Sequence, residues 1–317
     1  MVQRDLVQAV SRVAGLEASL ATAIRGKPDV IRLSVVCLLA KGHLLLEDVP
    51  GVGKTTLAQA LARSVDCGFQ RLQFTSDMLP SDVLGVTIYN NHAQLFEFKR
   101  GPVFTNFLLA DEINRATPKT QSALLEAMNE LQVTIDGHSY ALLHPFMVIA
   151  TQNPVEHHGT YPLPESQLDR FLMRLRIGYP DAQSEREILR NSGHDALAAK
   201  AVLTAEEVLE VQQAVSRISV DDSLVDYMLA VVTKSRHHES LALGVSPRGA
   251  QALYRAVQAL AFVEGREYAL PDDVKRLVVP LFAHRVVLSG RLPLSQRTAE
   301  ASERILQDIL NATEVPL

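Results

Sequence analysis

The residues with the clearest chemical potential lie between an apolar run at 44–46 and a run of helix formers at 56–63. Between these runs the chain reads Pro50-Gly51-Val52-Gly53-Lys54-Thr55-Thr56. Glycines between a strand and a helix let backbone N–H groups close around phosphate oxygens, and the helix N-terminus adds partial positive charge. Lys54 can then reach the β- and γ-phosphates, and the Thr55 hydroxyl can ligate Mg²⁺. We therefore predict a site for ATP and Mg²⁺.

One position departs from the usual phosphate-loop pattern G-x-x-x-x-G-K-[ST], because Asp48 stands where the first glycine is expected. The alternative interpretation of this stretch is an ordinary corner between a strand and a helix, with a threonine as the helix cap. The apolar strand before the loop and the helix after it favour phosphate binding.

A second group of candidates ends the next long apolar run. Residues 103–112 predict a buried strand that ends in Asp111 and Glu112. Ligands of open α/β sheets bind at the carboxyl ends of the strands. Because hydrolysis of a nucleotide needs a metal-side acid and a base for water, we expect Asp111 to hold Mg²⁺, through a water molecule, and Glu112 to activate the attacking water. The alternative is an acid pair that only faces solvent.

Asn153 follows another apolar strand, expected at 146–151. Its neutral amide could hydrogen-bond the attacking water or the γ-phosphate. Asn153 also begins an Asn-Pro pair, and such a pair is common in ordinary turns.

Two arginines are candidates for stabilising charge on a transferred phosphoryl group. Arg170 lies in an expected exposed turn from a helix into a strand, where it could act as an arginine finger for a neighbouring subunit or form a surface pair with Asp169. Arg248 lies in the first turn of a helix that Ser246 caps. A cation there opposes the helix dipole, which suggests an anionic partner; the alternative is a solvated side chain.

Composition places the chain among globular proteins with an aliphatic core. Of its 317 residues 47% are hydrophobic, and the net charge of −5 argues against a dedicated nucleic-acid binder. Its cysteines, Cys37 and Cys67, have no metal-ligand spacing and are expected to be buried reduced thiols. The N-terminus does not have the pattern of a signal peptide, and charged residues interrupt the apolar segment 30–46. We therefore expect a cytoplasmic protein without a membrane span.

Strands and helices alternate in the first part of the chain. The pattern predicts an α/β domain with a mostly parallel sheet covered by helices on both faces, and a domain boundary near 180. It also predicts two inserted β-hairpins, one near 86–98 with its turn at Asn90-Asn91 and one near 133–140 with a tight Asp136-Gly137 turn. We therefore expect an α/β domain at 1–180 and a helical domain at 181–317. We also expect helices at 3–24 and 29–40 and strands at 70–74 and 172–177. Signals for the start of a helix occur at Thr117-Pro118, Thr204 to Glu207, Ser246-Pro247 and Leu270-Pro271.

At these residues the sequence resembles the MoxR family of AAA+ ATPases, over about residues 10 to 280. The order and spacing of the matching stretches make them specific together: 46–55, 109–116, 121–128, 150–154, 159–165, 168–171 and 245–248. The resemblance implies an AAA+ P-loop domain followed by an all-α lid. It implies that Lys54 and Thr55 belong to Walker A and that Asp111 and Glu112 form Walker B. Asn153 resembles sensor 1, Arg170 the arginine finger and Arg248 sensor 2.

The family resemblance also implies partners. Its members form rings, usually hexameric, and act as chaperone-like ATPases on a client protein or complex. They commonly work with von Willebrand factor A-domain proteins and assemble complexes or insert metal cofactors. His157 and His158 depart from the commoner family pattern, and we interpret them as solvated loop residues rather than metal ligands because no third ligand is evident.

The expected mechanism places ATP·Mg²⁺ between the α/β domain and the helical lid. Arg170 would come from the next subunit and Arg248 from the lid. Two other classes of function stay open on the sequence. One is a nucleic-acid motor, against which the acidic balance and the lack of a basic, aromatic-rich patch both count. The other is a nucleotide-gated scaffold that hydrolyses ATP too slowly to act as a motor.

Overall fold

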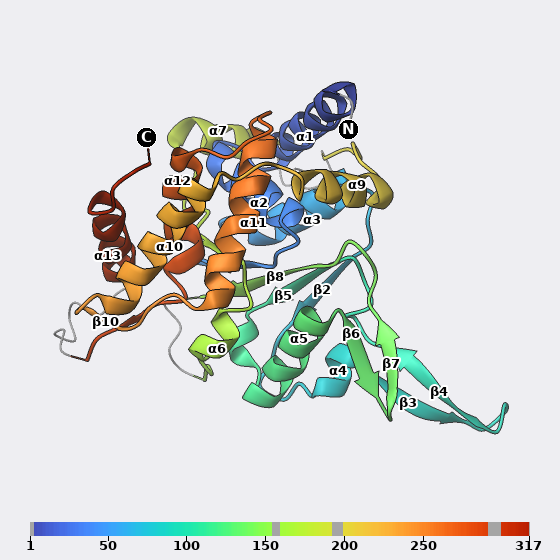
Figure 1. Cartoon of the computed structure of the whole chain (residues 1–317). Coiled ribbons are helices and arrows are strands. Elements are labelled where there is room, and N and C mark those ends of the chain that lie inside the picture. Colours follow the sequence, from blue (N-terminus) through green and yellow to red (C-terminus); the bar gives the residue numbers. More distant parts are fainter. Residues whose placement is uncertain (1–2, 154–158, 192–198, 291–298, 317) are drawn as a thin grey trace.

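A five-stranded parallel sheet lies at the centre of the N-terminal half (Figure 1). The computed structural model describes residues 3–153, 159–191, 199–290 and 299–316. Every neighbouring pair in the sheet is parallel, as predicted, so the carboxyl ends of the strands share one edge. In spatial order the strands are β2 (Phe69–Gln73), β5 (Phe107–Asp111), β8 (Met147–Gln152), β1 (Leu44–Glu47) and β9 (Met173–Leu175).

Alternate side chains of these strands are buried on opposite faces of the sheet. In β1, Leu44 and Leu46 pack into one cluster of buried side chains, and Leu45 packs into the other. Helices α1 (Gln3–Ala23), α2 (Pro28–Leu39) and α3 (Lys54–Ser64) contribute to the first cluster. Helices α4 (Pro80–Leu84) and α5 (Pro118–Glu130) contribute to the second, so helices cover both faces as expected.

The interior strand β5 is shorter than the expected strand at 103–112. Backbone N–H groups in the preceding segment bond locally, from Phe104 to the carbonyl of Gly101 and from Thr105 to that of Val103. These bonds hold the segment in a turn, and strand pairing begins only at Phe107. Strand β9 likewise covers only part of the expected 172–177.

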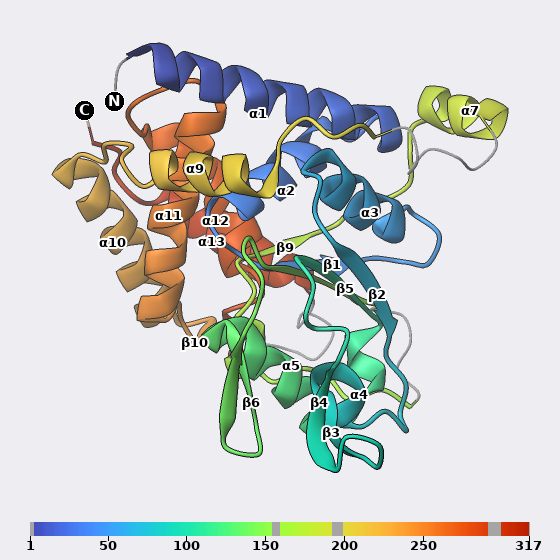
Figure 2. The ribbon, with the colours of Figure 1, turned by 90° about the vertical axis from the view of Figure 1, so that its right-hand side faces the viewer.

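Two β-hairpins project from the side of the sheet that carries α4 and α5 (Figure 2). The first pairs β3 (Gly85–Asn90) with β4 (Leu95–Arg100), and its loop is longer than the tight turn suggested by Asn90-Asn91. The second pairs β6 (Gln132–Ile135) with β7 (His138–Ala141) through Asp136 and Gly137, whose φ angles of 50° and 76° suit the predicted two-residue turn. Phe98 stacks on Tyr140 with ring centroids 4.3 Å apart, which joins the two hairpins.

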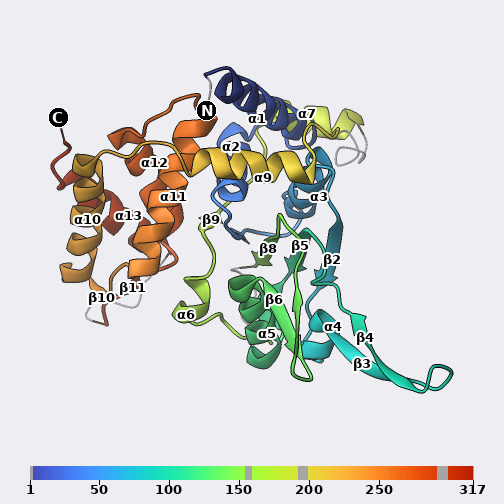
Figure 3. The same cartoon turned by 45° about the vertical axis from the view of Figure 1, so that its right-hand side comes forward.

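The C-terminal part is helical, as predicted, and its helices from residue 222 onward lie to one side of the sheet (Figure 3). The capping box of Thr204 and Glu207 and the cap by Ser246 are both present. The sequence did not predict one short antiparallel pair, β10 (Leu241–Leu243) with β11 (Val287–Leu288). The helices after the sheet are α7 (Ala182–Asn191), α9 (Ala205–Val215), α10 (Asp222–His237), α11 (Pro247–Val263), α12 (Pro271–Phe282) and α13 (Ala299–Asn311).

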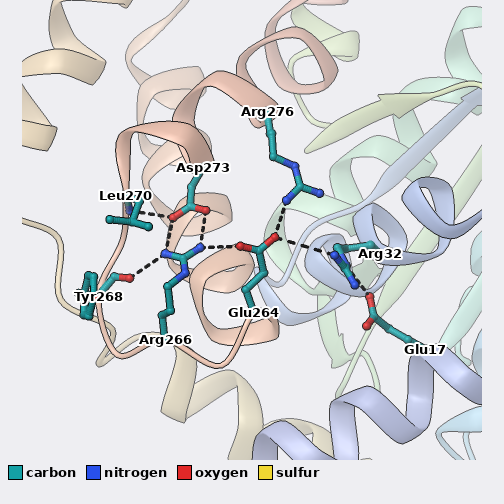
Figure 4. A network of polar contacts seen from close by, with 8 residues as sticks. All are labelled: Glu17, Arg32, Glu264, Arg266, Tyr268, Leu270, Asp273 and Arg276. Atoms are coloured by element: carbon teal, nitrogen blue, oxygen red, sulfur yellow. Dashed lines mark hydrogen bonds and ion pairs between the residues drawn. The ribbon is translucent and has the colours of Figure 1, made fainter. Parts of the chain in front are cut away.

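The helical part is attached to the first helices of the chain by packing and by charge. Buried side chains of α1, α2 and α3 belong to one continuous cluster with those of α9 to α13. Beside this core, Glu264 at the end of α11 accepts from Arg266 and Arg276 and lies 3.9 Å from Arg32 of α2, which in turn pairs with Glu17 of α1 (Figure 4). These contacts attach the helical part to α1 and α2. The domain boundary near 180 stays a prediction.

Candidate functional site

The loop between β1 and α3 has the backbone of a phosphate cradle. Gly51 and Gly53 adopt φ angles of +85° and +98°, which a side chain would strain. A Cβ atom at Gly51 would meet nothing within 4 Å, so conformation rather than crowding requires glycine there. Lys54 Nζ donates to the carbonyls of Asp48 at 2.6 Å and Val49 at 3.3 Å, and burial lowers the pKa of this half-buried amine. An amine held over this loop is well placed to meet a phosphate.

The structure explains why aspartate can replace the first glycine of the loop. Asp48 Oδ1 accepts from the N–H of Val49 at 2.9 Å, and Oδ2 accepts from the N–H of Gly178 at 2.6 Å. The carboxylate thereby ties the start of the loop to the segment after β9. Asp48 supports the cradle and does not block it.

The two acids lie at the end of β5, and Thr151 of β8 fixes both. The Thr151 hydroxyl donates to Asp111 Oδ1 at 2.7 Å and accepts from the N–H of Glu112 at 2.8 Å. Asp111 is buried, whereas Glu112 is half-buried and adopts a left-handed backbone with φ 56°. This geometry separates the two carboxylates and gives them different surroundings.

Two residues of β2 complete this group, and the sequence analysis missed both. Arg71 donates to Asp111 Oδ2 from Nη2 at 2.7 Å and from Nε at 3.1 Å. Gln73 Nε2 donates to Glu112 Oε2 at 2.8 Å, and Arg115 Nε lies 2.9 Å from the same oxygen. The signal was present, because Arg71 and Gln73 are polar side chains two apart on a predicted strand. Recognising it required the pairing of β2 with β5.

These side chains surround one cavity of about 360 Å³. Its oxygen donors, the Thr55 hydroxyl and the Asp111 carboxylate, are the hard ligands that Mg²⁺ prefers, so the residues fit this ion. The volume lies within the usual range of ligand pockets. The lining residues are Pro50, Gly51, Gly53, Lys54, Thr55, Thr56, Arg71, Gln73, Asp111, Glu112 and Asn153.

A second cavity, of about 550 Å³, adjoins the first and shares Gly51, Gly53 and Thr56 with it. Apolar side chains supply much of its wall, as suits the flat face of a purine base. Val52 lines this second cavity rather than the first. The apolar lining comes from the end of α1, the phosphate loop, the segment after β9 and α7, and includes Ile24, Val52, Ile177, Pro180, Ile188 and Leu189. The sequence analysis did not predict this set, because its members lie far apart in the chain.

A hydrogen bond joins the segments that carry the two candidate arginines, and neither arginine lines either cavity. Arg170 is half-buried, and its Nη1 donates to the carbonyl of Leu125 in α5, so the expected exposed turn is partly covered. Asp169 pairs with Arg285 and not with Arg170, against the alternative of a surface pair. Arg248 is exposed. It lies two residues after Ser246, whose hydroxyl donates to Asp169. In Figure 2 the beginning of α11 and α3 lie on opposite sides of the molecule.

The remaining expectations concern thiols, metals and membranes. Both cysteines are free; Cys37 is buried, and Cys67 is half-buried. His157 and His158 lie outside the described residues. In the part of the chain that the structure describes, no His, Cys, Asp and Glu side chains cluster in a metal-binding group of three, and no helix is long and apolar enough to cross a membrane. The cytoplasmic location stays a prediction.

Comparison with known proteins agrees with this geometry. Residues 43–173 match the family described as "ATPase family associated with various cellular activities (AAA)", and residues 233–309 match the AAA lid domain. A crystal structure of a candidate ATPase from Cytophaga hutchinsonii superposes with a TM-score of 0.90 at 36% identity, over 99% of this chain and 98% of that one. The fold and the site thus define an AAA+ ATPase with a helical lid.

Curated relatives narrow the class further. The chain is 44% identical to "Chaperone MoxR1" of Mycobacterium tuberculosis, over 84% of this chain and 73% of that protein. It is 32% identical to "Protein MoxR" of Paracoccus denitrificans, over 96% of both chains. It is also 50% identical to "Uncharacterized protein YeaC" of Bacillus subtilis, over 92% and 91%. The chain belongs to the MoxR family, as its motifs predicted.

Proposed function

We propose that this chain hydrolyses ATP at the interfaces of a homo-oligomeric ring, most simply a hexamer. The observation that carries the proposal is the separation of two half-sites on one chain. The residues proposed to bind phosphate, metal and water line one cavity, whereas Arg170 and Arg248 lie outside it on two segments that are joined by the Ser246–Asp169 hydrogen bond. A second copy that presents these arginines to the cavity would complete the site.

Each residue has a distinct part in this reaction. The phosphate loop and Lys54 bind the phosphates, and the apolar cavity beside them takes the base. Thr55 and, through a water molecule, Asp111 would hold Mg²⁺, which would supply neutralisation of phosphate charge when bound. Glu112 accepts a proton from the attacking water, and Asn153 orients that water. Glu112 must first be released from Gln73 and Arg115, which both hold its carboxylate.

The geometry favours one change to the expected mechanism. Arg248 was expected to reach the nucleotide from the lid of its own chain, with ATP between the α/β domain and the lid. Among the described residues of the C-terminal part, those of α7 line the base cavity and those of α11 do not. We therefore assign Arg248, like Arg170, to the nucleotide of the neighbouring copy.

The work done with ATP is the remodelling or maturation of a client protein or complex. The relative named as a chaperone supports a protein client. So do the exposed side chains of the first hairpin, Tyr89, Leu95 and Phe96, with exposed fractions of 46%, 47% and 73%. A von Willebrand factor A-domain protein is the proposed partner, and insertion of a metal cofactor is one proposed outcome.

The test combines ATP turnover with particle mass by light scattering, with and without ATP·Mg²⁺. Wild type should assemble with ATP and hydrolyse it, and Arg170→Ala should assemble but lose hydrolysis. A monomer that hydrolyses ATP equally well without Arg170 would refute the shared site. Turnover below about one per hour, with nucleotide-dependent partner binding, would support a scaffold instead.

A further inference from the structure

A buried arginine of the lid holds the segment that carries the candidate arginine finger. Arg285 follows α12, and only 2% of its side chain is exposed. Its guanidinium donates from Nε to Asp169 Oδ1 at 2.9 Å, from Nη2 to the carbonyl of Phe171 at 2.6 Å, and from Nη1 to that of Leu172 at 3.0 Å. All three nitrogens of the guanidinium are thus used on residues that flank Arg170.

Asp169 provides the charge that balances this buried cation. Burial is the largest influence on the pKa of Arg285 and lowers it to about 10, whereas Asp169 acts to raise it. Arg285 therefore remains charged at neutral pH and depends on Asp169. Removing one partner of such a pair is strongly destabilising, because the other charge is left buried without compensation.

On its other side, Asp169 is bound to the helix that carries Arg248. The Ser246 hydroxyl lies 3.2 Å and 3.1 Å from the two carboxylate oxygens and accepts from the N–H of Gly249 at 3.0 Å. Ser246 is the N-cap of α11, and Arg248 lies in the first turn. A single carboxylate therefore joins the segment of one candidate arginine to the helix of the other.

We propose that Asp169, Arg285 and Ser246 form a clamp that positions Arg170 and Arg248 as one rigid unit. The inference rests on the proposed function, in which both arginines act on the nucleotide of the next copy. The clamp residues are positioning residues, since they act through the two arginines. Because the lid supplies Arg285 and Ser246, a movement of the lid would change how both arginines meet the neighbouring phosphate.

The alternative is that the ion pair of Asp169 and Arg285 only stabilises the fold. The chain offers a matched control in Asp273 of α12, whose carboxylate accepts from Arg266 at 2.8 Å and 2.6 Å. Asp273 is 2% exposed, and its pair also braces the lid. It has no bond to the segment of Arg170 or to the start of α11 among the described contacts. Asp273→Asn should therefore disturb stability without disturbing the arginines.

The test measures how much ATP hydrolysis the arginines of one subunit support in the cavity of another. An acceptor, Arg170→Ala, keeps its own cavity but lacks the finger; a donor, Glu112→Gln, keeps its finger but lacks the base. Hydrolysis restored by mixing reports donor arginines acting in trans. The donor is then given Asp169→Asn, or Asp273→Asn as control, and light scattering verifies that each donor enters rings.

We expect the Asp169→Asn donor to restore at least about tenfold less activity than the plain donor, and the Asp273→Asn donor to match it. Equal rates with and without Asp169→Asn would overturn the clamp while leaving the shared site intact. If the plain donor restores nothing, the shared site fails, and the clamp with it. Should Asp169→Asn prevent assembly, the milder Ser246→Ala donor decides: an unreduced restored rate overturns the clamp.

Discussion

Acid should weaken the fold through one buried imidazole, His43, which precedes β1. Its Nδ1 accepts from the N–H of Val148 at 3.0 Å, and its Nε2 lies 3.2 Å from the carbonyl of Met128, so the neutral ring with a proton on Nε2 fits both partners. A second proton on Nδ1 would face the N–H of Val148, donor against donor. Burial lowers the pKa of His43 from 6.5 to about 4.

The sign and size of the effect follow from linkage. Above pH 6.5 the ring is neutral in both states, and the full stability is present. As the pH falls from 6.5 towards 4, His43 binds a proton in the unfolded chain but stays neutral in the folded chain, and stability is lost. A pKa lower by about 2.5 is equivalent to about 3.4 kcal/mol at the acid limit. Between about pH 7.5 and pH 5.5 the loss is about 1.3 kcal/mol.

The assay is urea unfolding at those two pH values for wild type and His43→Gln. Buried His284 also has a lowered pKa, so only the difference between the two proteins isolates His43. Wild type should lose about 1.3 kcal/mol more of its unfolding free energy than the variant on acidification. His92→Gln, which changes an exposed loop imidazole, is the control and should behave like wild type. An equal loss in wild type and His43→Gln would refute the reasoning.

Three further predictions concern the nucleotide site. Glu112→Gln should lower kcat by about 10²- to 10⁴-fold while retaining ATP binding and stabilising rings, and a wild-type rate would show that the base is misassigned. Gln73→Ala should raise basal turnover by about threefold to tenfold, because Glu112 loses the donor that draws it towards β2; a lower rate in steady-state assays would contradict this. Ile188→Glu should raise KM for ATP at least about tenfold and leave kcat unchanged at saturation, because it puts a charge in the apolar cavity. An unchanged KM would exclude that cavity as the site of the base.

The sequence predicted the parts of this molecule that depend on local patterns. The phosphate loop, the acids at the end of β5 and the Asp136-Gly137 hairpin are each encoded within about ten neighbouring residues. Their elements therefore had the expected type, although β5 and β9 are shorter than expected. Strand ends depend on which backbone groups find a partner in the neighbouring strand, and a single strand does not carry that information.

The sequence could not predict contacts between distant segments. Arg71 and Gln73 acquire their roles only because β2 lies beside β5. The bond between Asp169 and Arg285 joins residues 116 positions apart, and the base cavity combines α1, the phosphate loop and α7. The sequence analysis considered Asp169 only as the surface partner of Arg170 in the alternative interpretation, because a local pattern offers only sequence neighbours as partners.

The measurement that tests the account most directly is ATP hydrolysis in a mixture of two inactive proteins. One is Glu112→Gln, which keeps both arginines, and the other is the double variant Arg170→Ala, Arg248→Ala, which keeps an intact cavity. If both arginines serve the neighbouring copy, the mixture should hydrolyse ATP, with a maximum at intermediate ratios, although neither protein does so alone. A mixture that assembles into rings yet stays inactive at every ratio would contradict the shared site.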